Sequence, residues 1–182
     1  MTTLTRPALA PVPRALAFPV AVAAVVFTGA IFGFFYAWVC STMWGLDAAD
    51  PRTAIAAMQA MNASVRNPVF GAAFFGTVPV CLLAGALALG AGQRRAGGLL
   101  GAAGLLYLVG GVVLTMTYNV QLNEALAAVV VPPDAAAARM VWADYSAGWQ
   151  IGNIARTVVS GISLVLTALG LASLVGPPRA NR

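Results

Sequence analysis

The hydrophobic positions of this chain gather in four long stretches separated by shorter polar segments. These stretches are residues 17–41, 69–91, 97–117 and 151–175. Each one reaches the roughly 20 residues that an α-helix needs to cross a bilayer. In lipid every backbone polar group needs an internal partner, and stretches of this length satisfy that requirement as helices. The pattern therefore predicts an all-α integral membrane four-helix bundle over residues 17–175, with tails at residues 1–16 and 176–182.

The segments between the stretches predict additional short helices in two outer loops. Asp50-Pro51 is typical of an N-cap followed by proline in the first helical turn. The positions that follow repeat at helical spacing, which predicts an amphipathic helix over residues 52–67. In the second outer loop we expect helix over residues 117–131, a break at Pro132-Pro133 and a further helix from Ala135 that leads to the last span.

Composition and charge support the membrane assignment and predict an orientation. The chain is 60% hydrophobic and only 8% charged, whereas soluble domains carry about 25% charged residues. The two tails and the Arg94-Arg95 link hold six arginines and no acid, while the outer loops hold all five acids. Because cytoplasmic loops are enriched in basic residues, we expect a multi-pass protein of the cell membrane with both termini in the cytoplasm. The arginines form no basic run, so the lipid bilayer is the expected partner and nucleic acid is not.

The most informative polar residues lie at the mouth of the last span. Trp149, Asn153 and Arg156 are spaced i, i+4 and i+7, so on a helix their side chains point the same way. An arginine inside a lipid-spanning segment costs about 2.5–3.5 kcal/mol on insertion scales, and such residues usually face a protein interior or a wet cavity. The triplet therefore predicts a polar site at the outer end of this helix.

Other polar side chains are expected at the same depth. Asn119 and Asn123 lie on one helix face at the end of the third span, and Asn62 and Arg66 lie on one face of the outer amphipathic helix. Glu124, the acid nearest to a span, is the simplest partner for Arg156. Two interpretations remain open: a hydrogen-bonded network that locks the loops onto the bundle, or a pocket of amide donors, one cation and aromatic rings. The pocket would suit a flat apolar molecule with an oxygen that becomes negative.

The residue types that are absent limit the chemistry. The chain contains no histidine and no lysine, and it has no cluster of acids and no glycine-rich phosphate loop. Haem, copper and non-haem iron sites depend on imidazole ligands, and a serine nucleophile needs a base to activate it. The sequence therefore predicts no metal site and no organic cofactor.

The chain carries several short motifs: Gly33-Phe-Phe-Tyr36-Ala-Trp38, Met43-x-Gly45-Leu46, Ala57-Met58-Gln59-Ala60-Met61-Asn62, Arg66-Asn67-Pro68-x-Phe70, Asn119-Val120-Gln121-Leu122-Asn123-Glu124-Ala125-Leu126 and Trp149-x-x-x-Asn153-x-x-Arg156-Thr157. Together they resemble the anthrone-oxygenase-like family of small membrane proteins, over roughly residues 20–175. In two positions this chain departs from the family pattern, with Gln121 where proline is common and Ile154 where many members have histidine.

The resemblance implies oxygenation without a cofactor, because fungal members of the family convert an anthrone to an anthraquinone in polyketide pathways. In that reaction an enolate transfers an electron to O2 directly, and the protein binds the ring and stabilises the enolate oxygen. The residues that would carry out these roles fall into two groups. The catalytic group is Arg156, Asn153 and Asn123 at the oxyanion with Glu124 as base, and the substrate-binding group is Trp149 and Tyr36 at the ring with Asn119, Asn62 and Arg66 around them.

Other functions stay open at this stage. A non-catalytic membrane protein that binds a lipid or quinone-like molecule would use the same pocket. A small transporter is a third alternative, although spans one to three contain no charged residue well inside the membrane. The pairs Gly29/Gly33 and Gly97/Gly101 allow close helix packing, either within one bundle or between the copies of a homo-oligomer.

Overall fold

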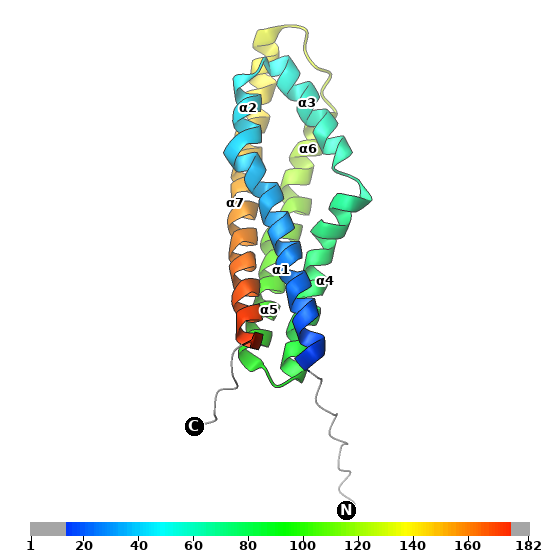
Figure 1. Ribbon diagram of the computed structural model, residues 1–182. Helices are drawn as coiled ribbons and strands as arrows, with labels where there is room; N and C mark the ends of the chain where they lie inside the picture. Colours follow the sequence, from blue (N-terminus) through cyan, green and yellow to red (C-terminus); the bar gives the residue numbers. More distant parts are fainter. Residues whose placement is uncertain (1–13, 176–182) are drawn as a thin grey trace, which may run out of the picture.

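The computed structural model describes residues 14–175, and over this range it is built of helices with no strand (Figure 1). The predicted all-α fold is confirmed. The elements in chain order are α1 (Arg14–Ala37), a π-helical segment (Trp38–Thr42), α2 (Met43–Ala48), α3 (Pro51–Ser64), α4 (Pro68–Gly90), α5 (Arg94–Tyr107), two π-helical segments (Leu108–Val113 and Thr115–Asn119), α6 (Val120–Ala127) and α7 (Ala135–Val175).

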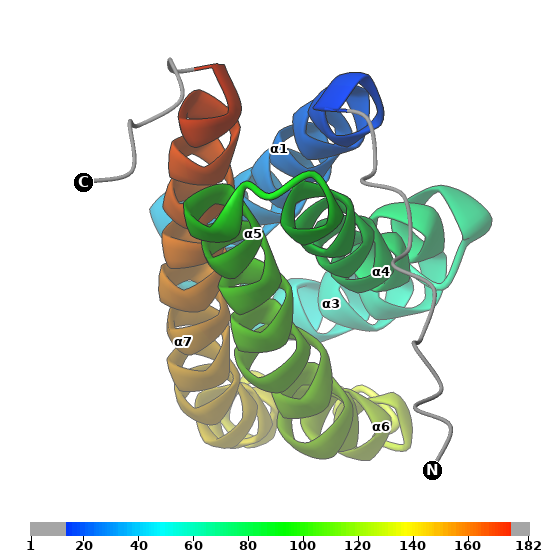
Figure 2. The ribbon, with the colours of Figure 1, turned by 90° about the horizontal axis from the view of Figure 1, so that it is seen from below.

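The four long helices form a ring around a common core. Figure 2 shows that α1 lies beside α4 and α7, and that α5 packs on the same two helices from the opposite side. One end of the bundle, here named the terminal end, holds the start of α1, the end of α7 and the turn between α4 and α5 (Figure 1). The opposite end, named the capped end, holds α2, α3, α6 and the start of α7.

Within the described range 14–175, four continuous helices are long and apolar enough to cross a membrane, which agrees with the four predicted spans. Helix α4 has 23 residues, or about 35 Å at 1.5 Å per residue, close to the hydrocarbon thickness. The other three are longer, with 34 residues over Ala15–Ala48, 34 over Arg94–Ala127 and 41 over Ala135–Val175. They extend past α4 at the capped end, where α2, α3 and α6 form a cap.

The boundaries of the predicted spans and loops need three corrections. The first span runs on through α2, and the helix expected to reach residue 131 ends at Ala127. The separate helix expected from Ala135 joins the last span in one uninterrupted α7. Residues 135–150 contain no proline and no glycine pair that would end a helix, so the hydrogen-bonded ladder continues from the loop into the span.

Side-chain caps stand at the N-termini of α3 and α4, near the capped end. Asp50 accepts a hydrogen bond from the Arg52 backbone N–H at 2.9 Å, as predicted for an N-cap before Pro51. The Arg52 guanidinium hydrogen-bonds the same carboxylate and lowers the pKa of Asp50 to about 2. Asn67 plays the same role for α4, because its Oδ1 accepts from the backbone N–H groups of Val69 and Phe70. These caps set where α3 begins and where α4 enters the bundle.

Close packing of small residues joins α4 to α5 at the terminal end. A Cβ added to Gly85 would lie 2.9 Å from the Gly101 backbone nitrogen and 3.1 Å from the Gly97 carbonyl oxygen. The Gly97/Gly101 pair therefore packs within one bundle. The turn that follows α4 uses Gly92 with a φ of 74°, and the next N–H, from Gln93, reaches back to the Ala88 carbonyl at 2.8 Å.

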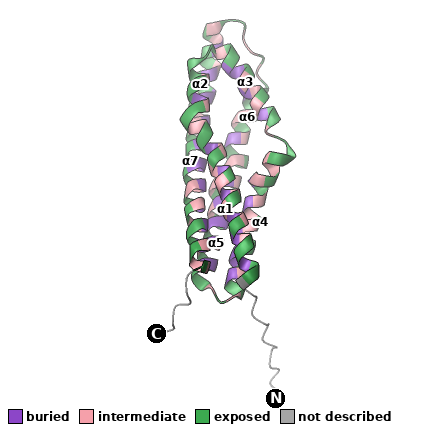
Figure 3. Cartoon of the chain, viewed as in Figure 1, coloured by how far each residue is buried: buried purple, intermediate pink, exposed green. Residues whose placement is uncertain are grey.

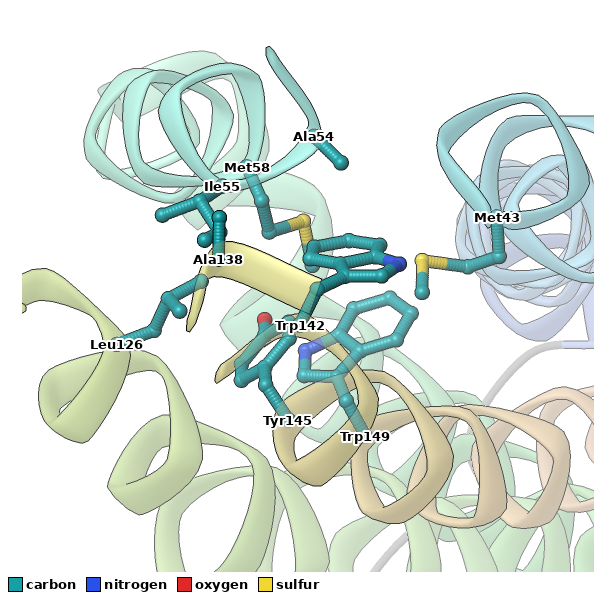
Figure 4. Close-up of a cluster of buried hydrophobic side chains, with 9 residues drawn as sticks. All are labelled: Met43, Ala54, Ile55, Met58, Leu126, Ala138, Trp142, Tyr145 and Trp149. Atoms are coloured by element: carbon teal, nitrogen blue, oxygen red, sulfur yellow. The ribbon is translucent and has the colours of Figure 1, made fainter. Parts of the chain in front are cut away.

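The interior is divided between the bundle and the cap. In the bundle, exposed positions follow the outward faces of the helices along their length, as Figure 3 shows. In the cap, Trp142, Tyr145 and Trp149 project from α7 towards Met43 of α2 and Met58 of α3 (Figure 4). The sulfur-rich, aromatic cap core holds α3 across the end of the bundle.

Candidate functional site

A cavity of about 440 Å³ lies where the bundle meets the cap. Its wall is largely apolar and includes seven aromatic side chains, and its polar groups come from four helical elements and one link. The polar and charged lining residues are Asn62 at the end of α3, Arg66 and Asn67 in the link to α4, Thr115 in the third π-helical segment, Asn123 and Glu124 on α6, and Asn153 and Arg156 on α7.

Arg156 is the most unusual of these residues because it is a buried cation with no carboxylate partner among residues 14–175. Its side chain is 5% exposed. One guanidinium nitrogen, Nη2, donates to Oδ1 of Asn153 at 3.1 Å, and the other, Nη1, donates to Oγ1 of Thr115 at 3.3 Å. Its Nε has no hydrogen-bond partner in the part of the chain that the structure describes.

Two aromatic rings hold the guanidinium in place. Its central carbon lies 4.7 Å from the centre of the Phe35 ring and 5.3 Å from that of Trp149. Such cation–π contacts contribute about 2 kcal/mol or more when they are desolvated. The rings and neutral dipoles stabilise the cation while leaving its charge uncancelled.

The expected ion pair between Arg156 and Glu124 is wrong. Glu124 instead forms a salt bridge with Arg66. Both of those side chains are more than half exposed, whereas Arg156 is buried. Glu124 thus pairs at the cavity mouth with Arg66, and both charges remain in contact with solvent. The partners of Arg156 are neutral groups.

The orientation of Asn153 follows from its neighbours on both sides. Its Nδ2 donates to the Phe35 backbone carbonyl at 3.1 Å, and this leaves Oδ1 facing Arg156. The residue therefore ties α7 to α1 and fixes the arginine at the same time. Both ends of its amide bond to the protein, and the second hydrogen of Nδ2 is not used in these two bonds.

A hydroxyl that does not line the cavity connects two amides that do. Tyr145 Oη donates to Oδ1 of Asn123 at 2.8 Å and accepts from Nδ2 of Asn62 at 3.3 Å. Because the Asn123 oxygen is taken by Tyr145, the donor Nδ2 of Asn123 remains for a ligand. Conversely, the oxygen of Asn62 remains as an acceptor.

The family model of anthrone oxygenases matches residues 66–166, which is more than half of the 182-residue chain. The chain belongs to the anthrone oxygenase family. Neither a curated protein nor a solved structure gives a significant match to it. The expected family is thus confirmed. The matched residues, 66–166, run from just before α4 into α7 and form part of the expected range 20–175.

The matched part of this anthrone-oxygenase-family chain supplies most of the polar cavity wall. Arg66, Thr115, Asn123, Glu124, Asn153 and Arg156 all lie within it. The wall contributed by α1 and by Asn62 lies outside the match. The cation and its hydrogen-bond partners therefore come from the family region, while one of the two rings that flank the cation, Phe35, does not.

Two of the nine predicted site residues do not line the cavity. Asn119 is fully buried, and its Nδ2 donates to the Trp149 backbone carbonyl at 3.1 Å. It faces Gly152, where an added Cβ would lie 2.4 Å from its Oδ1. Asn119 thus forms a contact between the third spanning helix (Arg94–Ala127, here called the third helix) and α7. The predicted pairing of Asn119 with Asn123 on one functional face is wrong.

Tyr36 is the second correction. Its side chain is 50% exposed and stacks on Phe32 with 5.6 Å between ring centres, on the outside of α1. The neighbouring Phe35 points inwards instead. In a stretch that is apolar on every side, no polar face indicates which of two adjacent rings lies inside.

Apart from Trp149, the sequence interpretation missed the aromatic side chains of the cavity wall, and it also missed Thr115. Trp38 packs on Trp149 with 5.0 Å between ring centres, and Phe34 packs on Phe70 at 4.8 Å. The signal available in the sequence was the spacing of Phe70 and Phe74, i and i+4, directly after the cap at Asn67. Thr115 gave no signal, because its position depends on the π-helical turns around it.

Proposed function

We propose that this chain oxygenates a flat polycyclic aromatic ketone of the anthrone type, without a metal or organic cofactor. One observation carries the proposal: Arg156 is a buried cation held by rings and neutral groups, beside a cavity with an aromatic wall. A buried charge of this kind is costly unless it is paired. An oxygen that gains negative charge during a reaction would supply that pairing in the transition state.

The reaction balances with O2 as the oxidant. The ring CH2 of an anthrone loses a proton, and the negative charge moves to the former carbonyl oxygen. The enolate gives one electron to O2, and the resulting carbon radical and superoxide combine and take up a proton to form a hydroperoxide. Loss of the second ring C–H proton and cleavage of the O–O bond release water and leave the second carbonyl. One anthrone and one O2 therefore give one anthraquinone and one water.

The residues divide this work between them. Arg156 and the free Nδ2 of Asn123 stabilise the enolate oxygen, and Asn153 and Thr115 position Arg156. Trp149 and Phe35 stack against the ring system. Glu124 is the carboxylate of the cavity wall and is the candidate base, and its position at the mouth lets the proton pass to solvent. Each role is a proposal for this chain.

The test is oxygen uptake by the purified protein in lipid vesicles supplied with anthrone, corrected for anthrone in empty vesicles. We expect consumption of O2 and formation of anthraquinone in equal amounts. Arg156→Ala should lower the rate by about 10²–10³, the usual effect of removing an oxyanion donor. Arg139→Ala is the matched control, since Arg139 is an exposed arginine on the same helix.

A second candidate function is non-catalytic binding of a quinone-like molecule. The observation that favours it is that the only carboxylate of this wall, Glu124, already forms a salt bridge with Arg66. Saturable binding of an anthraquinone with no oxygen uptake above the empty-vesicle rate would support binding alone and contradict the oxygenase.

A further inference from the structure

We propose that the cavity is filled sideways from the bilayer, through an opening between α4 and residues 115–120, and that its ligand is a membrane-dissolved amphiphile. The ligand would carry its weakly acidic oxygen at the hydrocarbon boundary and its rings below that level. This inference rests on the proposed function for the chemistry of the ligand. The route itself rests on the shape and surface of the cavity alone.

The opening exists because α4 and the third spanning helix (Arg94–Ala127) diverge towards the capped end. Helix α4 packs tightly on α5 through its glycines, as described above. Further along, residues 115–127 pack on α7 and α3 instead. The cavity wall includes Gly71 and Phe75 on one side of this gap and Met116 and Val120 on the other. The two helices thus form two edges of one opening.

The side chains at these edges face outwards and are apolar. Phe75 is 55% exposed and Met116 is 46% exposed, although both line the cavity. On the lateral surface of a bundle whose four helices are long and apolar enough to span a membrane, such exposed apolar side chains contact lipid. The four residues named at the edges of this opening are uncharged, so an apolar molecule dissolved in the bilayer passes apolar groups there.

The polar and apolar parts of the cavity lie at different depths in the membrane, and these depths match those of the two ends of an amphiphile. Arg156 lies 19 residues before the end of α7 at Val175, or about 29 Å along the helix, which is close to the thickness of the hydrocarbon core. Phe75 lies 15 residues before the end of α4 at Gly90, or about 23 Å along the helix, and so lies deeper in the membrane than Arg156. The cation is therefore at headgroup depth, and part of the aromatic wall is in the hydrocarbon.

The route from water is less favourable. At the cap side the mouth carries the Arg66–Glu124 salt bridge, whose two side chains are more than half exposed. To use this route, a flat apolar molecule dissolved in the bilayer would first have to move from lipid into water. It would then have to pass the two solvated charges of the salt bridge. The lateral route requires neither step.

Access kinetics provide the first test. Xanthone is a planar ketone of anthrone shape that has no ring CH2 to oxidise, and it quenches tryptophan fluorescence, so Trp38 and Trp149 in the cavity wall report its binding. Gly71→Leu adds bulk at the opening, where a Cβ meets no atom within 4 Å. We expect it to slow xanthone association in vesicles by about tenfold or more. Gly98→Leu is the matched control, because Gly98 is a helical glycine with equal free space that does not line the cavity.

Surface accessibility provides the second test, in a Cys40→Ser background that retains the buried Cys81. A nitroxide attached to Met116→Cys should collide often with dissolved O2 and rarely with a water-soluble nickel chelate, as a label at the exposed Leu105→Cys on α5 does. A label at Ser64→Cys on the cap should show the reverse. A Met116 label that resembles the Ser64 label would overturn the lateral opening.

The two proposals fail separately. Xanthone association that is equal in Gly71→Leu, Gly98→Leu and the unaltered protein, or an absence of xanthone binding, contradicts lateral filling whatever the oxygen uptake. Slowed association in Gly71→Leu without any oxidation of anthrone supports lateral filling and contradicts the oxygenase.

Discussion

The Tyr145 hydroxyl donates to Oδ1 of Asn123 at 2.8 Å, although Tyr145 itself does not line the cavity. This bond determines which end of the Asn123 amide faces the ligand. It also joins α7 to α6, and the second bond of the hydroxyl, with Asn62, joins α7 to α3. One hydroxyl thus couples the position of the cap to the polarity of the site.

Tyr145→Phe tests this coupling. The change leaves the Asn123 oxygen and the Asn62 nitrogen without a partner, which should lower the free energy of unfolding by about 1–3 kcal/mol. The Asn123 amide then loses its fixed orientation, so xanthone affinity should fall as well. Thermal unfolding in detergent and fluorescence quenching measure the two effects. Tyr118→Phe is the control, since Tyr118 does not line the cavity, and equal behaviour of the two variants would contradict the role of Tyr145.

Thr115→Val tests how Arg156 is positioned. Valine keeps the shape of the side chain but removes the oxygen that accepts from Nη1 of Arg156 at 3.3 Å. A hydrogen bond to a charged group contributes about 1.5–3 kcal/mol, so oxygenase activity should fall roughly tenfold or more. Thr117→Val serves as the comparison, because Thr117 bonds only to the Val113 carbonyl and lies outside the cavity. Activity unchanged in Thr115→Val would show that Asn153 and the rings are sufficient.

Gly152→Ala tests the contact between the third helix and α7. The added methyl group would lie 2.4 Å from Oδ1 of Asn119 and 2.8 Å from a ring carbon of Tyr118. Overpacking of this kind typically costs about 1–3 kcal/mol, so the melting temperature should drop. Gly148→Ala, one turn earlier on α7, meets its nearest neighbour at 3.5 Å and should be neutral or stabilising. If both variants melt alike, the helices at Gly152 are not in close contact.

The orientation in the membrane is a prediction from charge. Six arginines and no acid on the tails and the Arg94-Arg95 link predict a cytoplasmic terminal end. Reporter fusions after Arg182 should be active only in the cytoplasm, and a tag placed at Ala49 should be accessible only from outside. A carboxyl-terminal reporter that is active only on the outer side would reverse the topology and place the cavity in the opposite leaflet.

The sequence predicted the fold well because hydropathy alone decides which segments cross a membrane. It also brought Trp149, Asn153 and Arg156 to the same site, since all three line the cavity as their helical spacing predicted. Periodicity relates residues within one helix but does not determine how that helix is turned towards its neighbours. Phe35 and Tyr36 show this limit, because both are aromatic neighbours in an apolar stretch and only packing decides which one lies inside.

Asn119 and Asn123 show a second limit. Their i, i+4 spacing predicted one shared face, yet one contacts the backbone of α7 and the other the cavity. Asn119 ends a π-helical segment and Asn123 lies in α6. The partner of Glu124 was missed for a related reason, since sequence separation says nothing about which arginine shares its solvent exposure.

The π-helical turns have a consequence for how the third helix can vary. A π-turn accommodates one residue more than an α-turn, and each residue of an α-helix accounts for about 100° of rotation. The segments at Leu108–Val113 and Thr115–Asn119 therefore set the rotational phase of α6 independently of that of α5. A single-residue deletion there would leave the glycine contacts of α5 with α4 intact while swinging Asn123 and Glu124 away from Arg156. The rotation of α5, which packs on α4, and the rotation of α6, which turns Asn123 and Glu124 towards the cavity, can therefore change independently of each other.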